Sequence, residues 1–390
     1  MSGSEQAARP TDLRQLADLM RTGGRLLPTG GGTALSWGAP VEPVDTVLGT
    51  DGLAEVLAYN PADMTVAVGA GIRLGSLQRM LAEHGQRVSL DAARIGQGAT
   101  VGGLLATADA GPLRHVHGSL KDLVLGATVV FADGTVARTG GHVVKNVAGY
   151  DLVKLVSGSL GTLAVIAEVV LRLHPRPEHT GTLTVRCPIA EAFRYANTLV
   201  RSPLEPVSLD WEDGRLVAGF EGTVRSVASR LERAAALIPA PSEQEQQPLP
   251  WPTDPTGDAR ASDTPGGAAT VLRVGTRPSD VGELATRLRR LTEERELMVR
   301  WQSQLTVGVH TVRFTGGDPD AHAAVLNAWR PLVEAGNGSV TVLDRVAGLD
   351  ERTDAWGSPP SWAPVLRALK QRLDPDDRLS PGRFAPWIGR

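Results

Sequence analysis

The sequence predicts an α+β protein of two domains, on three observations. Its 390 residues, 42% of them hydrophobic, can bury two cores. Up to about residue 178, strands and helices are mixed and glycines crowd the loops between them. After that point the order of strand and helix occurs twice. We therefore expect a first domain over 1–178, a second over 179–360, and a C-terminal helix and tail over 361–390.

Charge and cysteine content exclude several classes of function. The formal net charge is −3, from 40 basic and 43 acidic residues, so the chain lacks the excess of positive charge that is typical of proteins that bind nucleic acid or an anionic membrane. Cys187 is the only cysteine, so an internal disulfide and a metal site built on several thiolates are excluded. No apolar leader precedes Pro10 and no apolar run could span a bilayer, so we expect a cytoplasmic protein.

In the first domain, spacing and turn residues predict the elements in order. Asp51 is a cap for a short helix that ends before Pro61, and Asp133-Gly134 predicts a hairpin. The expected elements are helices over 51–60, 74–85 and 151–156 and strands over 65–68, 124–131, 135–139 and 163–173.

The second domain is predicted to contain two βαβ-type halves around one sheet. The expected strands are 182–186, 207–211, 215–220, 270–274, 306–314 and 339–343, and the expected helices are 191–200, 224–238, 280–291 and 321–333. In the C-terminal segment a final helix is expected over 363–373. Between the halves, 239–269 is rich in Pro, Glu, Gln, Asp, Ser and Gly. We expect this segment to be a disordered insertion, because it cannot bury enough apolar area to offset the entropy of ordering.

The first chemical signal is the run Pro28-Thr-Gly-Gly-Gly-Thr-Ala-Leu-Ser36. Three consecutive glycines let the loop turn its amides towards a phosphate with no Cβ in the way, and Thr33 and Ser36 add hydroxyl donors. A flexible surface turn explains the run equally well. The Gly-Lys-Ser/Thr ending of an ATP-binding loop is missing.

A second glycine string, Gly69-Ala-Gly71-Ile-Arg-Leu-Gly75, follows a strand and precedes a helix. That order is typical of a dinucleotide-binding turn, with Asp91 at a plausible distance for a ribose hydroxyl. The spacing is one residue too long for the standard fingerprint, and no second Val- and Ile-rich strand carries Asp91. We therefore do not expect a nicotinamide site here.

Two further glycine-rich blocks complete the pattern. In 95–107, Gly102-Gly103 would open a helix whose free N–H groups can bind an anion. Glycines at both ends of the later run 144–168 suit close approach of the backbone to a ligand.

In their order and separation, these blocks resemble the PCMH-type FAD-binding domain of the vanillyl-alcohol-oxidase superfamily. Within it, they are most similar to the FAD-binding E subunits of bacterial glycolate oxidase. The resemblance rests on 29–35, Thr100-Val-Gly-Gly103, Ala110-Gly-Pro112, Gly118-Ser-Leu-Lys-Asp122, Leu125-Gly126, Lys145-Asn-Val-Ala-Gly-Tyr-Asp151, Gly158-Ser-Leu-Gly-Thr162, Asp374-Pro375 and Pro381-Gly-Arg383. It covers the chain apart from 239–269. It implies a two-subdomain FAD-binding domain, an α+β cap domain with an antiparallel sheet, and a tail that returns to the FAD-binding domain.

The resemblance also assigns cofactor-binding residues. The FAD pyrophosphate would be held by the glycine loop, that is by Thr29, Gly30, Gly31, Gly32, Thr33, Ala34 and Leu35. A second cofactor loop would be lined by Thr100, Gly102, Gly103 and Thr107. The ring and ribityl side of FAD would lie near Gly111, Gly118 and Asp122, and the adenine would contact the backbone of Ile166.

Departures from the family pattern bear on the chemistry. The glycine loop has neither His nor Cys, so we expect non-covalent FAD. The H-x-x-x-E-x-H metal motif of related catalytic subunits is missing, and His310 and His322 have no matching partners, so no metal site is expected. The catalytic residues are not determined. Weak candidates are Arg114, His117, Tyr150 and Arg383, with Arg94, Arg114 and Arg383 able to fix a substrate carboxylate.

The resemblance implies a FAD-dependent oxidoreductase subunit that oxidises a small 2-hydroxy acid and passes electrons from flavin to partners. The implied partners are a larger flavin subunit and an iron–sulfur subunit, through which any membrane contact would be made. Three alternatives stay open. The chain could be a self-sufficient FAD oxidase or dehydrogenase of another alcohol or hydroxy acid, a non-catalytic FAD-binding subunit, or a protein whose glycine loops are purely structural.

Overall fold

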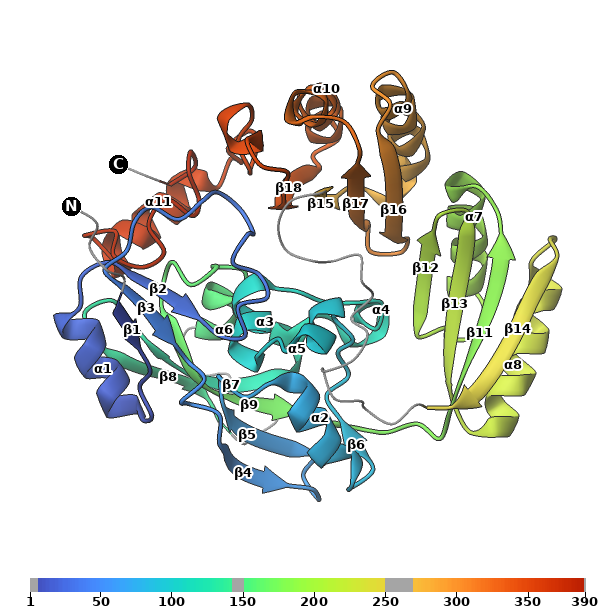
Figure 1. The fold of residues 1–390 in the computed structure, drawn as a ribbon. Coiled ribbons are helices and arrows are strands. Elements are labelled where there is room, and N and C mark those ends of the chain that lie inside the picture. Colours follow the sequence, from blue (N-terminus) through green and yellow to red (C-terminus); the bar gives the residue numbers. More distant parts are fainter. Residues whose placement is uncertain (1–5, 142–150, 250–268, 389–390) are drawn as a thin grey trace.

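The structure is a computed structural model, and it describes residues 6–141, 151–249 and 269–388. Two layers of the chain face each other (Figure 1). An N-terminal domain carries helices α3 (Val101–Thr107) and α4 (Arg114–His117) on its upper side, and the sheet of the second domain lies above them. The chain is α+β, as the sequence predicts.

The N-terminal domain is built on two sheets and a short ladder. A parallel sheet has the order β1-β3-β2, an antiparallel sheet has the order β4-β5-β9-β7-β8, and β6 pairs with β10. The strands are β1 (Gln6–Ala8), β2 (Leu26–Thr29), β3 (Thr46–Gly49), β4 (Val56–Asn60), β5 (Thr65–Gly69), β6 (Gln86–Arg87), β7 (Val124–Val130), β8 (Val136–Gly140), β9 (Val165–Arg172) and β10 (His174–Pro175). The other helices are α1 (Leu13–Thr22), α2 (Leu74–Ala82), α5 (Leu120–Leu123) and α6 (Leu152–Val156).

The second domain contains one antiparallel sheet of eight strands, in the order β14-β11-β13-β12-β16-β17-β15-β18. Each half of it is a βαββαβ unit, larger than the βαβ-type half expected from the sequence, which predicts neither the strand Ser242–Pro248 nor the strand Met298–Gln304. The halves comprise β11 (His179–Arg186), α7 (Ile189–Val200), β12 (Ser208–Glu212), β13 (Arg215–Gly222), α8 (Val224–Leu237) and β14 (Ser242–Pro248); and β15 (Ala269–Gly275), α9 (Val281–Glu293), β16 (Met298–Gln304), β17 (Val309–Thr315), α10 (Pro319–Ala335) and β18 (Ser339–Asp344).

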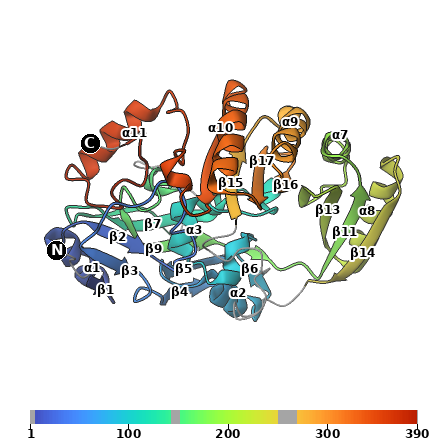
Figure 2. The same cartoon turned by 45° about the horizontal axis from the view of Figure 1, so that its top comes forward.

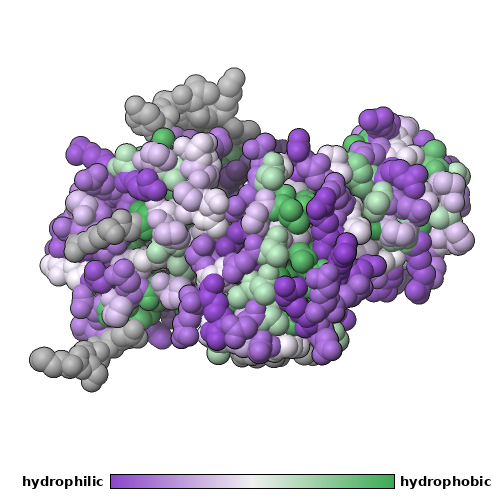
Figure 3. Space-filling view, turned by 90° about the horizontal axis from the view of Figure 1, so that it is seen from above, coloured by the Kyte–Doolittle hydropathy of each residue, from purple (hydrophilic) through white to green (hydrophobic). Residues whose placement is uncertain are grey.

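Strand alternation gives this sheet one apolar and one polar face. Leu272 and Val274 point into the core beneath helices α7 to α10, whereas Arg273 between them points the other way, towards the N-terminal domain. The view from above the helices shows their outer surface as mostly hydrophilic, with a hydrophobic strip near its centre (Figure 3). The part of the polar face around Arg273 therefore lies between the domains.

The C-terminal segment lies beside the N-terminal residues (Figures 1 and 2). After helix α11 (Ala363–Leu373), the guanidinium of Arg378 donates to the carbonyl oxygens of Met20, Gly24 and Ala132. The buried Lys370 ammonium donates to Asp374 Oδ2 and to the carbonyl oxygen of Thr162. These bonds fasten the tail to the N-terminal domain. The domain boundaries inferred above remain predictions.

Two predicted segments differ from the structure. The helix expected after Asp51 is wrong, because Val56–Asn60 pairs with β5 as an edge strand. The prediction of disorder from 239 is wrong for Ser242–Pro248, which forms β14 against β11. This strand is held by backbone hydrogen bonds to β11, which require no buried side chains. Its glutamates and glutamines are suited to an exposed edge of a sheet. The rest of that segment, 250–268, lies outside the described residues. In the described ranges, no helix has the length and apolar character needed to cross a bilayer.

Candidate functional site

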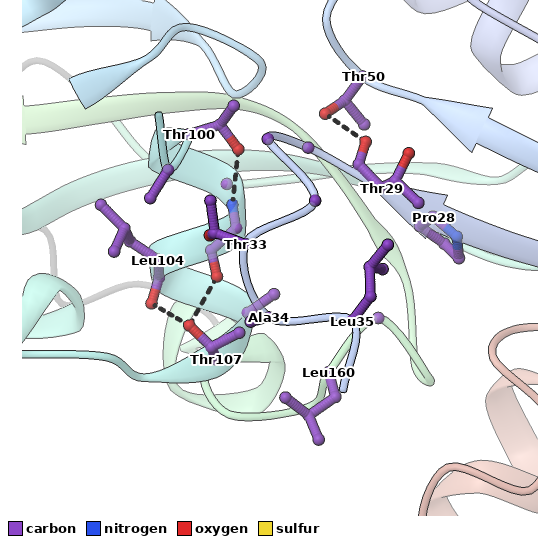
Figure 4. A pocket seen from close by; sticks show the side chains of 18 of the residues that line it. Pro28, Thr29, Thr33, Ala34, Leu35, Thr50, Thr100, Leu104, Thr107 and Leu160 are labelled. Carbon is purple, nitrogen blue, oxygen red and sulfur yellow. Dashed lines mark hydrogen bonds between the residues drawn. The ribbon is translucent and has the colours of Figure 1, made fainter. Parts of the chain in front are cut away.

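A pocket separates the triple-glycine loop from helix α3. Figure 4 shows Thr33, Ala34 and Leu35 of the loop on one side and Thr100, Leu104 and Thr107 on the other. The lining consists of Leu27, Pro28, Thr29, Gly30, Gly31, Gly32, Thr33, Ala34, Leu35, Thr50, Arg94, Ala99, Thr100, Gly102, Gly103, Leu104, Ala106, Thr107, Asp109, Leu160, Gly161, Ala164, Val165, Ile166 and Arg383. The loop and the helix start therefore face each other across one groove.

The glycines of this groove have two different roles. A Cβ atom at Gly30 would overlap Thr100 Oγ1, and one at Gly31 would overlap the carbonyl oxygen of Gly98. These two glycines let the loop pack onto the segment before α3. At Gly32 the nearest side-chain atom would be 3.9 Å away, and at Gly103 only Thr100 Oγ1 comes near, at 3.1 Å. These two glycines leave open space in the pocket.

The backbone amides of the loop are free to bind an anion. In the part of the chain that the structure describes, no protein acceptor receives a hydrogen bond from the amides of Gly31 to Ala34. Unpaired amides of a glycine-rich loop can bind phosphate groups. The loop therefore has the donors that the sequence predicted for it.

The prediction that free amides of the α3 N-terminus bind an anion is wrong. Val101 N donates to Ile72 O at 3.0 Å, and Gly102 N donates to Ala70 O at 2.8 Å. Gly103 N donates to the capping hydroxyl of Thr100 at 3.2 Å. Because the protein already satisfies these donors, α3 supplies a wall of small residues rather than an anion site.

Arg94 joins the loop to the opposite wall. Its Nε atom donates to Thr33 O at 3.0 Å, and its guanidinium lies 4.3 Å from the ring centroid of Trp37. Its Nη1 atom is 3.7 Å from Asp109 Oδ2. A positive charge is thus held beside the free amides. We predicted Arg94 as a substrate ligand, and the structure places it in the wall of this pocket.

Most of the predicted cofactor residues line this one pocket. They are Thr29, Gly30, Gly31, Gly32, Thr33, Ala34, Leu35, Thr100, Gly102, Gly103, Thr107 and Ile166. Gly111, Gly118 and Asp122 are not in its lining.

Those three residues have local structural partners instead. A Cβ at Gly111 would come within 2.5 Å of Asp91 Oδ1, so Gly111 allows close packing against Asp91. Gly118 has φ +76° and packs beside the carboxylate of Asp122. Asp122 Oδ2 accepts from Ser119 N at 2.8 Å in a capping box for α5.

The weak catalytic candidates are not gathered around one point. Arg383 lines the pocket, but its Nη1 donates to the carbonyl oxygens of Trp37 and Ala39. Arg114 and His117 lie on α4 outside the lining, and the His117 ring packs against His174 with centroids 4.6 Å apart. Tyr150 lies outside the described residues.

Other polar groups that the sequence left open have structural partners. His310 contacts the hydroxyls of Ser303 and Thr276, each at 2.8 Å. Cys187 is buried, and its Sγ donates to Val185 O at 3.7 Å. Gly69 and Gly71 pack against the backbone of Leu53 and Thr50, which explains that second glycine string.

Sequence reasoning missed several pocket residues. Thr50 Oγ1 donates to Thr29 O at 3.1 Å and supports the start of the loop. Leu160 has φ +52°, unusual for a residue with a side chain, and its amide donates to Ala106 O. The matched block 158–162 indicated this segment, but Thr50 had no signal in the sequence.

Comparison with known proteins agrees with this geometry. Residues 5–140 match the family model described as "FAD binding domain". Over these residues the chain therefore carries a FAD-binding domain, as the resemblance predicted, and it is a FAD-dependent oxidoreductase.

Two curated relatives place the chain more narrowly. It is 28% identical over 343 residues to glycolate oxidase subunit GlcE of Escherichia coli K12, covering 84% of each chain. It is 35% identical over 189 residues to D-lactate dehydrogenase of Archaeoglobus fulgidus, covering 48% of this chain and 42% of that protein. The chain thus spans most of the first relative and under half of the second.

Among solved structures, alkyldihydroxyacetonephosphate synthase has a TM-score of 0.69. That match covers 96% of this chain and 76% of the synthase at 17% identity. At that identity, the likeness shows the fold alone.

Proposed function

We propose that this chain is the FAD-binding subunit of a 2-hydroxy-acid oxidoreductase, which takes electrons from a small hydroxy acid such as glycolate and passes them to partner subunits. The observation that carries the proposal is the row of unbonded amides from Gly31 to Ala34, on a loop that lines a pocket opposite α3 in a FAD-binding domain. The relatives named above act, by their names, on glycolate and D-lactate.

In this proposal the pocket residues divide the work of holding FAD. The loop amides and the Arg94 guanidinium bind the diphosphate, because both place positive charge at the same wall. Gly32 and Gly103 leave room beside the backbone. Apolar walls that include Leu27, Ala164 and Ile166 suit flat rings. FAD itself supplies the two-electron acceptor chemistry.

The cofactor is proposed to be held without a covalent bond. The described loop from Thr29 to Ser36 contains no His or Cys. The buried Cys187 is in the core of the second domain, away from the pocket. With no nucleophile on the loop, acid precipitation should release the flavin into the supernatant.

The partner subunits are inferred from the relatives. One is named as a subunit of glycolate oxidase, and so is GlcD of Bacillus subtilis, 30% identical over 215 residues. We propose a larger flavin subunit and an iron–sulfur subunit as partners. A self-sufficient dehydrogenase and a non-catalytic flavin carrier are the competing functions.

One set of measurements separates these functions. The purified chain is examined by absorption spectroscopy before and after acid precipitation, and then with glycolate or D-lactate and an artificial electron acceptor. A yellow chain that needs its partner subunits for turnover supports the proposal. Turnover by the chain alone favours the self-sufficient enzyme, and a flavin that no substrate reduces even with the partners favours the carrier. A folded, colourless chain that ignores added FAD contradicts the proposal.

A further inference from the structure

A second cavity lies between the N-terminal domain and the polar face of the eight-stranded sheet of the second domain, called the cap sheet below. It is lined by Trp37, Thr107, Ala108, Gly158, Leu160, Arg273, Val274, Gly275, Val309, Ser339, Thr341, Leu343 and Trp356. Thr107 and Leu160 also line the cofactor pocket, so the two cavities adjoin. A small molecule in the second cavity would therefore lie next to whatever fills the first.

Arg273 is the charged group in the lining of this cavity. Its Nη2 donates to Ala108 O at 3.0 Å, and its Nη1 makes a longer bond of 3.4 Å to Thr107 O. A guanidinium has five N–H donors, so most of its donor capacity is left over. In the described part of the chain, no carboxylate forms an ion pair with Arg273. A partly buried cation without an anionic partner, beside a cavity, is suited to an anionic ligand.

Hydroxyl groups flank this guanidinium on the same face of the sheet. Thr341 on β18 and Thr311 on β17 are the direct partners of Arg273 in the antiparallel register. Directly opposed residues point to the same face. Ser339 lies opposite Gly275, and its Oγ would be 3.1 Å from a Cβ atom at that glycine, so the hydroxyl packs over the glycine backbone. Thr341 and Ser339 both line it.

The local charge also favours an anion. Burial lowers the pKa of the Arg273 guanidinium, Asp109 acts in the opposite direction, and the charges of Arg114 and Arg94 lower it further. Two further guanidinium groups and the Asp109 carboxylate thus act on Arg273. Arg94 is bonded to the glycine loop and sits in the cofactor pocket, which leaves Arg273 as the cation of the second cavity.

We infer that this cavity binds the carboxylate of the substrate, with Arg273 as its main ligand and the hydroxyls of Thr341 and Ser339 beside it. The inference rests on the proposed function, because it takes the ligand to be a small 2-hydroxy acid. In such an acid the carbon to be oxidised is bonded directly to the carboxylate carbon. Fixing the carboxylate at Arg273 therefore places the reacting carbon near Thr107 and Leu160, where the cavity meets the cofactor pocket.

The test uses oxalate, an unreactive planar carboxylate, titrated into the flavin-loaded chain while flavin absorption is recorded. The wild-type chain should show a saturable spectral change. Arg273→Met should weaken oxalate binding about 10- to 100-fold, because a charge-assisted bidentate contact is lost. Arg287→Met, an exposed arginine on α9 paired with Glu283, is the matched control and should bind as the wild type does.

Arg273→Lys provides a second test in case the Arg273→Met variant does not fold. Lysine keeps the charge but lacks the planar fork, so binding should fall severalfold with thermal unfolding unchanged. The inference is overturned if the flavin-loaded wild type does not respond to oxalate, or if both Arg273 variants bind it as tightly as the wild type. The proposed function fails separately, when the chain holds no flavin at all.

Discussion

The Nε atom of Arg94 donates a hydrogen bond of 3.0 Å to the carbonyl oxygen of Thr33, which joins the segment before α3 to the loop that faces it. The same guanidinium stacks on Trp37, so its position is fixed from two sides. The cofactor pocket is therefore shaped by a contact between residues that are far apart in the sequence.

Replacing Arg94 should weaken FAD binding. Arg94→Met removes the charge next to the loop amides and the bond to Thr33, and we expect the Kd for FAD to rise about 10- to 100-fold. Fluorescence titration of the deflavinated chain measures this change. Arg290→Met on the exposed side of α9 is the control. Equal affinity in the Arg94 and Arg290 variants would contradict a role for Arg94 at the cofactor.

Gly103→Leu should block FAD binding without unfolding the chain. At this position a side chain meets only Thr100 Oγ1 among protein atoms, so it projects into open pocket space. Gly96→Leu, where nothing lies within 4 Å and no pocket is lined, is the matched control. The ratio of flavin absorption to protein absorption should drop for Gly103→Leu alone. A fully yellow Gly103→Leu protein would show that the cofactor lies elsewhere.

The ion pair between Arg87 and Glu221 should contribute to holding the domains together. Arg87 Nη1 donates to Glu221 Oε1 at 2.8 Å, and the two side chains are only 12% and 13% exposed. Arg87→Met leaves the Glu221 carboxylate buried and unpaired, which should lower the free energy of unfolding by about 3 kcal/mol. Chemical denaturation measures the change. The double variant with Glu221→Leu should recover most of the loss, and no recovery would mean that the charge is not its cause.

Stability should fall as pH rises, because of a carboxyl at the domain interface. Burial raises the pKa of Asp210 from 3.8 to about 8, and the negative charges of Asp91 and Glu212 add to the shift. The folded chain therefore binds a proton that the unfolded chain has lost between about pH 4 and 8, so the contribution of this group declines across that range.

Asp210→Asn mimics the protonated carboxyl and should remove this decline. Its gain in unfolding free energy over the wild type should grow from pH 6 to pH 8.5, as measured by denaturation at each pH. Asp63→Asn, at an exposed turn, is the control and should show no such trend. A constant difference between Asp210→Asn and the wild type across this range would contradict the assignment.

The sequence correctly predicted the helices and turns that are determined by residues close together in the chain. Helix α11 occupies Ala363–Leu373 as expected, and the predicted hairpin at Asp133-Gly134 joins β7 and β8. The glycine run at 30–32 also indicated its loop correctly, because backbone freedom without a Cβ is a property of the residues themselves.

Long-range contacts decided the rest. Val56–Asn60 and Ser242–Pro248 became strands because neighbouring strands offered them backbone partners. The amides at the start of α3 donate hydrogen bonds to the carbonyl oxygens of Ala70 and Ile72. No motif in the sequence indicates these bonds.

The sequence by itself determined the class of protein, since the ordered glycine blocks identify a FAD-binding domain. Only the tertiary structure decided which groups line the cavities. Arg273 carries no motif, and it reaches the site because strand alternation turns it away from the cap core and sheet packing brings it to Ala108. Spacing along the chain fixes local conformation, whereas the meeting of distant side chains depends on how the layers pack.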